Sequence, residues 1–175
     1  NIGHSALRTW AMGERAFEQA ATEEDLRVME RELRDAMRAG AIGFTTSRTM
    51  NHETSDDRPV ASRMADWHEV ERLVGVLGDV GGGMFEIAQE SASRSKDPAV
   101  RADFFGRMTD LAVRTGVPFT FGVLSTSRDG SDWQGQLGMI DAAAAAGGRM
   151  YGQAHCREFS VLLSWKTRLP FDVLP

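Results

Sequence analysis

The sequence predicts an α/β fold in which strands and helices alternate, and three observations support this prediction. Four short apolar runs begin near residues 41, 84, 117 and 150, with a helical pattern between each run and the next. The segments that precede these runs are tight and glycine-rich, whereas the segments that follow them are long and polar. No GxGxxG motif follows any of the runs. Strict alternation indicates parallel strands with right-handed crossovers, and even spacing without that glycine motif favours a partial (β/α)8 TIM-type barrel of about four to five parallel β/α units.

The chain opens on NIGHSALR (residues 1–8), which reads as the end of a strand running into a loop. A helix is expected over 22–39, because Thr22 can cap its first turn and acidic residues follow. An apolar stripe runs along this helix at intervals of three or four residues: Leu26, Met29, Leu33 and Met37. Gly40 suits the position just beyond the helix end, and residues 41–47 (AIGFTTS) form the next strand.

Two further helix–strand units follow. The apolar face of the second helix consists of Met64, Trp67, Val70, Val74 and Leu77. Glycines 81–83 end this helix, and residues 84–89 (MFEIAQ) form a strand. A third helix is expected over 98–115, since a proline is accepted in the first turn, and residues 117–124 (VPFTFGVL) are the next strand. The inner face of that helix consists of Phe104, Met108, Leu111 and Ala112.

The fourth unit is a helix over about 132–146, with Ser131 as its cap, followed by a strand over 150–156 (MYGQAHC). The side chains expected to face inward from this helix are Trp133, Leu137, Ile140 and Ala144. Four or five strands cannot close a barrel of eight, so the sheet would have open edges. We expect these edges to pair with the rest of a barrel or with another copy of the chain.

Residues 1–175 are interpreted as a single domain that is an interior segment of a larger barrel. The first residue is Asn1 rather than Met, and the chain stops abruptly at LPFDVLP. The net charge of −5 and the absence of a basic block argue against nucleic-acid and anionic-membrane partners. The single cysteine, Cys156, cannot form an internal disulfide, and no apolar run is long enough to cross a membrane. We therefore expect a cytoplasmic protein with a small-molecule partner.

The polar segments that follow the strands are the expected location of a site, because the working residues of such barrels lie at the carboxyl ends of the strands. The residues predicted from this position to contact a substrate are Ser47, Arg48, His52, Gln89 and Gln153. The guanidinium of Arg48 could grip a substrate carboxylate through two hydrogen bonds, or it could form a salt bridge to Glu53, Asp56 or Asp57. His52 is either a substrate contact or a solvated loop residue.

His155 is the best candidate for a metal ligand, because it ends the last strand with Gln153 two residues earlier on the same face. Its neighbour Cys156 would point to the opposite side of the strand, which argues against a thiol nucleophile paired with it. His68 is expected on the solvent side of the second helix. The sequence contains no GxSxG, CxxC or HExxH motif.

Three segments carry a resemblance to a known family: GHSALR (3–8), MGERA (12–16) and ATEEDLRVMERELRDAMRAGAIGFTTSRT (21–49). Together they resemble the N-acyl-D-amino-acid deacylase branch of the amidohydrolase superfamily. EIAQE and VPFTFGVL fall where that family places its next strands, so the match covers most of the chain in order. The resemblance implies a metal-dependent hydrolase on a (β/α)8 barrel, in which one or two zinc ions activate water to attack the amide of an N-acyl-D-amino acid.

The chain departs from the family pattern at the metal ligands. The superfamily's HxH pair and its late aspartate lie outside this chain, and the family's histidine is missing at Leu124-Ser125-Thr126. Gln89 stands where the family has a His–Arg pair. Any zinc is therefore expected in the full-length parent, with none certain in this segment. Within the family-like GHSALR, His4 either bonds a backbone carbonyl or lines the site near the substrate carboxylate together with Arg8.

Three functions follow from these observations. The first is a segment of a metal-dependent amidohydrolase acting on an N-acyl-D-amino acid, inactive in isolation because too few ligands are present. The second is a non-catalytic barrel relative that binds a small acid or a partner, which the missing histidine at 125 favours. The third is a hydrolase of another linear or cyclic amide.

Overall fold

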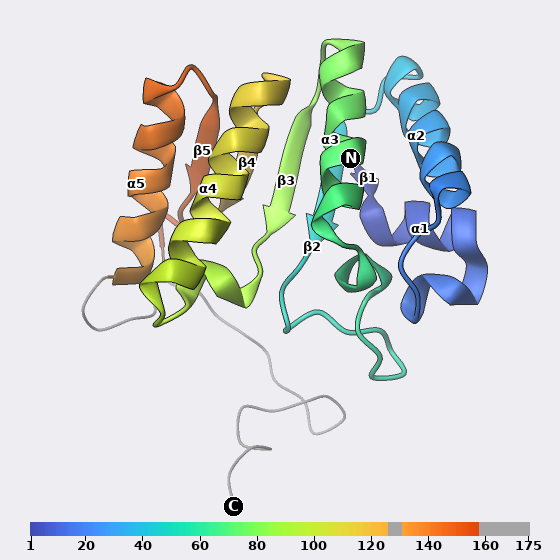
Figure 1. Ribbon diagram of the computed structural model, residues 1–175, viewed down its shortest axis with the longest axis horizontal. Coiled ribbons are helices and arrows are strands. Elements are labelled where there is room, and N and C mark those ends of the chain that lie inside the picture. Colours follow the sequence, from blue (N-terminus) through green and yellow to red (C-terminus); the bar gives the residue numbers. More distant parts are fainter. Residues whose placement is uncertain (126–130, 158–175) are drawn as a thin grey trace, which may run out of the picture.

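A computed structural model describes residues 1–125 and 131–157 and contains one open sheet of five parallel strands in the order β1-β2-β3-β4-β5 (Figure 1). The strands are β1 (Ile2–Gly3), β2 (Gly43–Ser47), β3 (Met84–Ala88), β4 (Phe119–Gly122) and β5 (Met150–Gln153). Every neighbouring pair is parallel. The predicted strand direction is confirmed, and the open sheet with helices over one face (Figure 1) is the arrangement of a partial TIM-type barrel.

Five α-helices connect the strands, and Figure 1 shows α2 to α5 side by side over one face of the sheet. They are α1 (His4–Met12), α2 (Glu23–Arg38), α3 (Trp67–Val80), α4 (Pro98–Thr115) and α5 (Ser131–Ala145). Three short 3₁₀ turns add to them: Gly13–Phe17, Ala61–Met64 and Ser91–Arg94. Among the described residues, no helix is both long enough and apolar enough to span a membrane.

The helix ends follow the local chemistry expected from the sequence. Thr22 and Asp25 form a reciprocal capping box at the start of α2. Burial would raise the pKa of Asp25, but hydrogen bonds from Arg15 and Thr22 overcome it and lower the pKa to about 2. Gly81 ends α3 and Gly116 ends α4, both with a positive φ that glycine adopts without strain.

The core lies between the sheet and the helices. Phe44, Phe85 and Phe119 stand in register on adjacent strands and are fully buried. The rings of Phe44 and Phe85 are 5.8 Å apart, and those of Phe85 and Phe119 are 4.8 Å apart. Because side chains alternate along a strand, the next residues, Thr45 and Glu86, belong to the opposite face. The sheet therefore has an aromatic face toward the helices and a polar face away from them.

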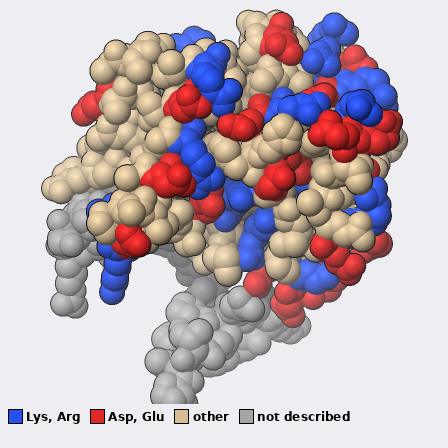
Figure 2. Space-filling view, viewed as in Figure 1, with Lys and Arg blue, Asp and Glu red and all other residues tan. Residues whose placement is uncertain are grey.

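Salt bridges connect the solvent side of neighbouring helices. Arg72 of α3 donates to Glu30 of α2 at 2.5 Å, and Arg114 of α4 donates to Glu71 of α3 at 2.8 Å. Figure 2 shows acidic and basic side chains intermixed over this face. Such mixing gives no concentrated positive potential on this face for a polyanion to bind.

The structure corrects four local predictions. NIGHSALR does not run into a loop, because helix α1 begins directly at His4. Met64 lies in a 3₁₀ turn before α3, and β5 ends at Gln153 rather than continuing to 156. In α5, Leu137 is 42% exposed and Ala144 is also exposed. The buried positions of that helix are Gln136, Met139 and Ala143. The glycines and alanines of α5 define no clear apolar stripe, which explains the last error.

Candidate functional site

A pocket of about 700 Å³ lies at the carboxyl ends of β1 to β4. This is the end at which barrels of this type carry their sites. Four predicted site residues line it: His4, Ser47, His52 and Gln89. The other predicted residues, Arg8, Arg48, Gln153 and His155, are not among its lining residues.

The polar face of the sheet forms the floor of the pocket. The carboxylate of Glu86 accepts hydrogen bonds from Asn1 Nδ2 at 3.3 Å and from Gln153 Nε2 at 3.5 Å. Gln153 Nε2 also donates to Thr120 Oγ1 at 2.8 Å. Gln153 therefore helps to position Glu86, which lines the pocket. The predicted contact of Gln153 with a substrate stays a prediction.

Small residues leave space above this floor. Ala88 stands beside Ser47 in the register, and Gly122 occupies the same level of the next strand. A Cβ atom built on Gly122 would meet nothing within 4 Å. A ligand can therefore approach the exposed side of Ser47 without meeting a bulky side chain at either position.

Ser47 and His52 form a polar pair at the rim of the pocket. Ser47 Oγ lies 2.7 Å from His52 Nδ1, and both side chains line the pocket. The backbone of Ser47 is fixed from below, since Ser62 Oγ donates to its carbonyl oxygen at 2.8 Å. A fixed hydroxyl beside an imidazole can donate to a ligand, accept from it or pass it a proton.

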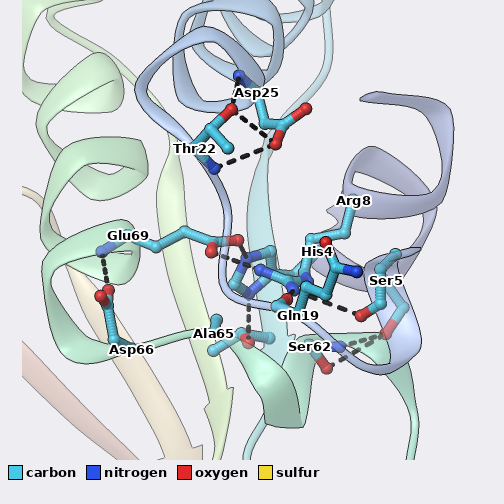
Figure 3. A network of polar contacts seen from close by, with 12 residues as sticks. His4, Ser5, Arg8, Gln19, Thr22, Asp25, Ser62, Ala65, Asp66 and Glu69 are labelled. Carbon is cyan, nitrogen blue, oxygen red and sulfur yellow. Dashed lines mark hydrogen bonds and ion pairs between the residues drawn. The ribbon is translucent and has the colours of Figure 1, made fainter. Parts of the chain in front are cut away.

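A second histidine belongs to a buried polar network beneath the pocket (Figure 3). His4 Nδ1 lies 2.8 Å from Thr46 Oγ1, and His4 Nε2 lies 2.7 Å from Glu69 Oε1. Arg8 forms an ion pair with the other oxygen of Glu69 and donates to Gln19 O at 2.7 Å. His4, Arg8 and Glu69 are at most 2% exposed.

The protonation states of this network follow from burial and charge. Burial lowers the pKa of His4, and it outweighs the opposing effect of the hydrogen bond that His4 donates to Glu69. Burial alone would raise the pKa of Glu69, but the hydrogen bonds from His4 and Arg8 and the positive charge of Arg8 lower it. Glu69 is therefore an anion and His4 is neutral. An anionic carboxylate only accepts, so His4 carries its proton on Nε2, and Thr46 donates to Nδ1.

The predicted roles of His4 and Arg8 change in the light of this network. His4 does not bond a backbone carbonyl, because side chains engage both of its ring nitrogens. The guanidinium of Arg8 is enclosed by Glu69, Ala16 O and Gln19 O, which explains why it does not reach the pocket. The network instead joins α1, β2 and α3 at the point where β2 ends.

Arg48 does not form the predicted salt bridge to Glu53, Asp56 or Asp57. Its guanidinium donates to the carbonyl oxygen of Ala65 and, at 3.5 Å, to that of Ser62. Its nearest carboxylate partner is Glu90, at 3.9 Å, rather than Glu53, Asp56 or Asp57. Arg48 therefore connects the segment before α3 to Glu90, which follows β3. The predicted contact of Arg48 with a substrate stays a prediction.

Gln89 pairs with a residue that the sequence did not single out. Gln136 Nε2 of α5 donates to Gln89 Oε1 at 3.0 Å. Within the described part of the chain, Gln89 Nε2 and Gln136 Oε1 have no hydrogen-bond partner. One amide donor and one amide acceptor thus remain in this pair, and both residues line the pocket.

The described residues do not fit a metal site by themselves. Over residues 1–125 and 131–157, no three His, Cys, Asp or Glu side chains come together in a way that could hold a metal ion. His155 lies beyond the end of β5 and is exposed, as is the free Cys156. Ser125 is exposed at the exit of β4, and Thr126 lies outside the described residues.

The most important residue that sequence reasoning missed is Glu69. It lies in the first turn of α3, where its backbone N–H donates to the capping carboxylate of Asp66 at 2.8 Å. In the sequence, Glu69 was only an acidic residue in the first turn of a helix. Such a residue usually faces solvent and interacts favourably with the helix dipole. Glu86 was also missed, although a charged residue inside an apolar strand run is a signal for a polar face of the sheet.

Comparison with solved structures finds this fold in a known enzyme. The N-acyl-D-glutamate deacylase from Bordetella bronchiseptica was determined with zinc and a phosphonate inhibitor that mimics the tetrahedral intermediate of its reaction. It matches this chain with a TM-score of 0.63 and 21% identity. The match covers 85% of this chain and 28% of the deacylase chain, so the chain spans less than a third of that protein's length.

The chain has the fold of part of that deacylase. A second match, to the L-hydantoinase (dihydropyrimidinase) from Arthrobacter aurescens, has a TM-score of 0.46 and 15% identity over 77% of this chain and 31% of that one. No protein-family model matches the chain, and no curated protein matches its sequence. The deacylase match and the five parallel strands confirm the fold that the sequence resemblance implied.

Proposed function

We propose that this chain is an interior part of a longer amide-hydrolysing barrel enzyme, and that its pocket forms one wall of the substrate site. The observation that carries the proposal is the position of the pocket, at the carboxyl ends of four parallel strands of this fold. The solved deacylase with the same fold adds support. The N-acyl-D-amino acid remains the proposed substrate class.

The polar groups around the pocket suit an amide substrate. An amide presents a carbonyl acceptor and an N–H donor, and its hydrolysis needs both to be held in a fixed orientation. Ser47 and His52 offer a hydroxyl and an imidazole at the rim, and Gln89 with Gln136 offers a further donor and acceptor. We propose that these side chains position the substrate.

Zinc is proposed only for the full-length protein. The described residues do not form a metal site, so its ligands would come from other parts of the barrel. When bound, zinc would supply a polarised carbonyl and an activated water. The residues of this chain would bind and orient the substrate. The exposed free Cys156 suits a reducing compartment, and we propose the cytoplasm.

The test is hydrolysis by the full-length protein of N-acetyl-D-amino acids, their L enantiomers and a cyclic amide, with metal content measured by elemental analysis. We expect release of free D-amino acid that a chelator abolishes and zinc restores. Preference for the L enantiomers or the cyclic amide would replace the substrate class but keep the hydrolase. Absence of all three activities from a zinc-loaded protein would refute the proposal.

A pocket-filling variant links that activity to this chain. Gly122→Leu places a side chain in the open space of the pocket at the level of Ser47, and we expect KM to rise by at least about tenfold, which is a loss of about 1.4 kcal/mol in binding. Gly106→Leu is the matched control, because Gly106 is exposed on α4 and its Cβ would also meet nothing within 4 Å. Equal effects of the two variants would exclude the pocket as the substrate site.

A non-catalytic binding protein is the second candidate. It is favoured by the missing metal cluster in the described part of the chain and by Leu124 and Ser125 at the exit of β4. A metal-free full-length protein that binds an N-acyl amino acid in calorimetry, without hydrolysing it, would establish this alternative.

A further inference from the structure

Among the described residues, one hydroxyl–imidazole pair lies at the rim of the pocket and a second lies buried beneath it, and of these two the rim pair is placed to react with a ligand. Ser47 Oγ lies 2.7 Å from His52 Nδ1, within hydrogen-bond distance of a potential base. Thr46 Oγ1 lies 2.8 Å from His4 Nδ1, but Thr46 is 3% exposed and His4 is 1% exposed. Glu69 and Thr46 occupy both nitrogens of His4, whereas His52 is exposed in the pocket.

Ser47 has the placement that a nucleophile needs. It is the last residue of β2, and its register partner is Ala88 on the polar face of the sheet. Its carbonyl oxygen accepts from Ser62, and the next backbone N–H, that of Arg48, donates to Ala88 O at 2.8 Å. The strand end is therefore held on both sides, while the open position at Gly122 leaves room for an acyl group.

We propose that Ser47 is an acylatable nucleophile and that His52 is its base, forming a reactive site in this pocket that needs no metal. The substrate class is an activated acyl or phosphonyl compound. Ser47 Oγ attacks the electrophilic carbon or phosphorus and forms a new bond to it, while the hydroxyl proton passes to His52 Nδ1. The bond to the leaving group then breaks, and that group departs with its electron pair as an anion or takes the proton back from His52.

This site goes beyond the proposed amide hydrolysis and can be tested apart from it. A covalent adduct on Ser47 forms in the presence of a chelator, which silences any metal-dependent turnover. A protein that fails to hydrolyse N-acyl amino acids can therefore still be labelled. Conversely, a zinc-dependent hydrolase can fail to be labelled, and each proposal stands or falls on its own result.

The experiment treats the full-length protein with a fluorophosphonate probe in the presence of a chelator and maps the adduct by peptide mass spectrometry. We expect one phosphonyl group, on Ser47, with fluoride released. Ser47→Ala abolishes the adduct, and His52→Gln slows its formation about 100-fold, the usual contribution of a general base. Circular dichroism of both variants confirms that they fold.

Two controls separate this site from general reactivity. Ser125→Ala removes an exposed serine at the exit of β4, and His68→Gln removes an exposed histidine on α3. Both leave the labelling rate unchanged if the proposal is correct. The absence of any adduct, an adduct on another residue, or an unchanged rate in folded His52→Gln would each overturn it.

Discussion

Thr46 and Ser47 are neighbours on β2, and each lies within hydrogen-bond distance of a histidine, yet the two pairs occupy opposite environments. Thr46 contacts His4 beneath the pocket, where Glu69 and Arg8 complete a buried polar network. Ser47 contacts His52 at the rim, where both side chains face the pocket. Because side chains alternate along a strand, one residue step decides between burial and exposure.

A hydroxyl–imidazole pair can therefore either hold neighbouring elements together or react with a ligand, depending on its surroundings. In the buried pair an anionic carboxylate fixes the tautomer of His4, and α1, β2 and α3 are held together through it. In the exposed pair, no charged group among the described contacts fixes the tautomer of His52, and the hydroxyl of Ser47 is accessible to a ligand. Three predictions test this difference.

Breaking the buried ion pair should have the largest effect. Glu69→Gln keeps the shape of the side chain but leaves the charge of Arg8 buried without a counter-ion. We expect the free energy of unfolding to fall by about 3–5 kcal/mol, as for other buried pairs that lose one partner. Urea unfolding measures this change.

An exposed ion pair provides the control for that prediction. Glu24 and Arg27 of α2 are 3.2 Å apart, and both side chains are more than half exposed. Glu24→Gln should change stability by no more than about 0.5 kcal/mol, since exposed pairs contribute little. Similar losses in the two variants would mean that Glu69 does not hold a buried charge.

The two hydroxyl groups themselves give a smaller and more direct contrast. Thr46→Val keeps the volume of the side chain but leaves His4 Nδ1 without its donor, and we expect a loss of about 1–3 kcal/mol. Ser47→Ala removes an exposed hydroxyl and should cost no more than about 0.5 kcal/mol. Thermal or urea unfolding of the two variants side by side measures both. A larger loss for Ser47→Ala would reverse the assignment of structural and accessible pairs.

The repeating units of this fold were predictable because each is encoded locally. Thr22 capped α2 as expected, Pro98 began α4, and Gly116 ended it. Such signals act within one helical turn, so a single sequence reveals them. In α5, by contrast, alanine and glycine have no strong preference for one face of the helix. Packing against the rest of the protein determines that Gln136, Met139 and Ala143 are buried.

The site was only partly predictable because it depends on contacts between distant segments. Ser47 and His52 are close in sequence, and the end of a strand was a sufficient signal for their position at the pocket, while their contact with a substrate stays a prediction. The partner of His4 lies 65 residues away on α3, and no local pattern announces that pairing. The contacts of Arg48 with the carbonyl oxygen of Ala65 and with Glu90 likewise join segments that are at least 17 residues away, and no local pattern indicated them.

The last and smallest effect is the dependence of stability on pH. The pKa of His4 in the folded protein lies below its ordinary value of 6.5, chiefly because of burial. Well above pH 6.5, His4 is unprotonated in both the folded protein and the unfolded chain, so its contribution to the free energy of unfolding is complete. As the pH falls below 6.5, the unfolded chain takes up the proton and the folded protein does not, so the free energy of unfolding decreases. The pKa of Glu69 is lowered from 4.5, and its contribution is lost only below that value.

Between pH 6.5 and about 5, the pH dependence of the free energy of unfolding therefore reports on His4 and not on Glu69. The groups that face its ring are Glu69 from α3, Arg8 from α1, and Thr46 and Arg48 from the end of β2. One proton gives a slope of at most about 1.4 kcal/mol per pH unit, which urea unfolding at several pH values can resolve. His4→Gln should reduce this slope even if it also lowers stability, whereas His68→Gln, an exposed substitution on α3, should keep it. If His4→Gln retains the full slope, the acid sensitivity arises outside the buried network, and the neutral His4 inferred for the buried pair would have to be abandoned.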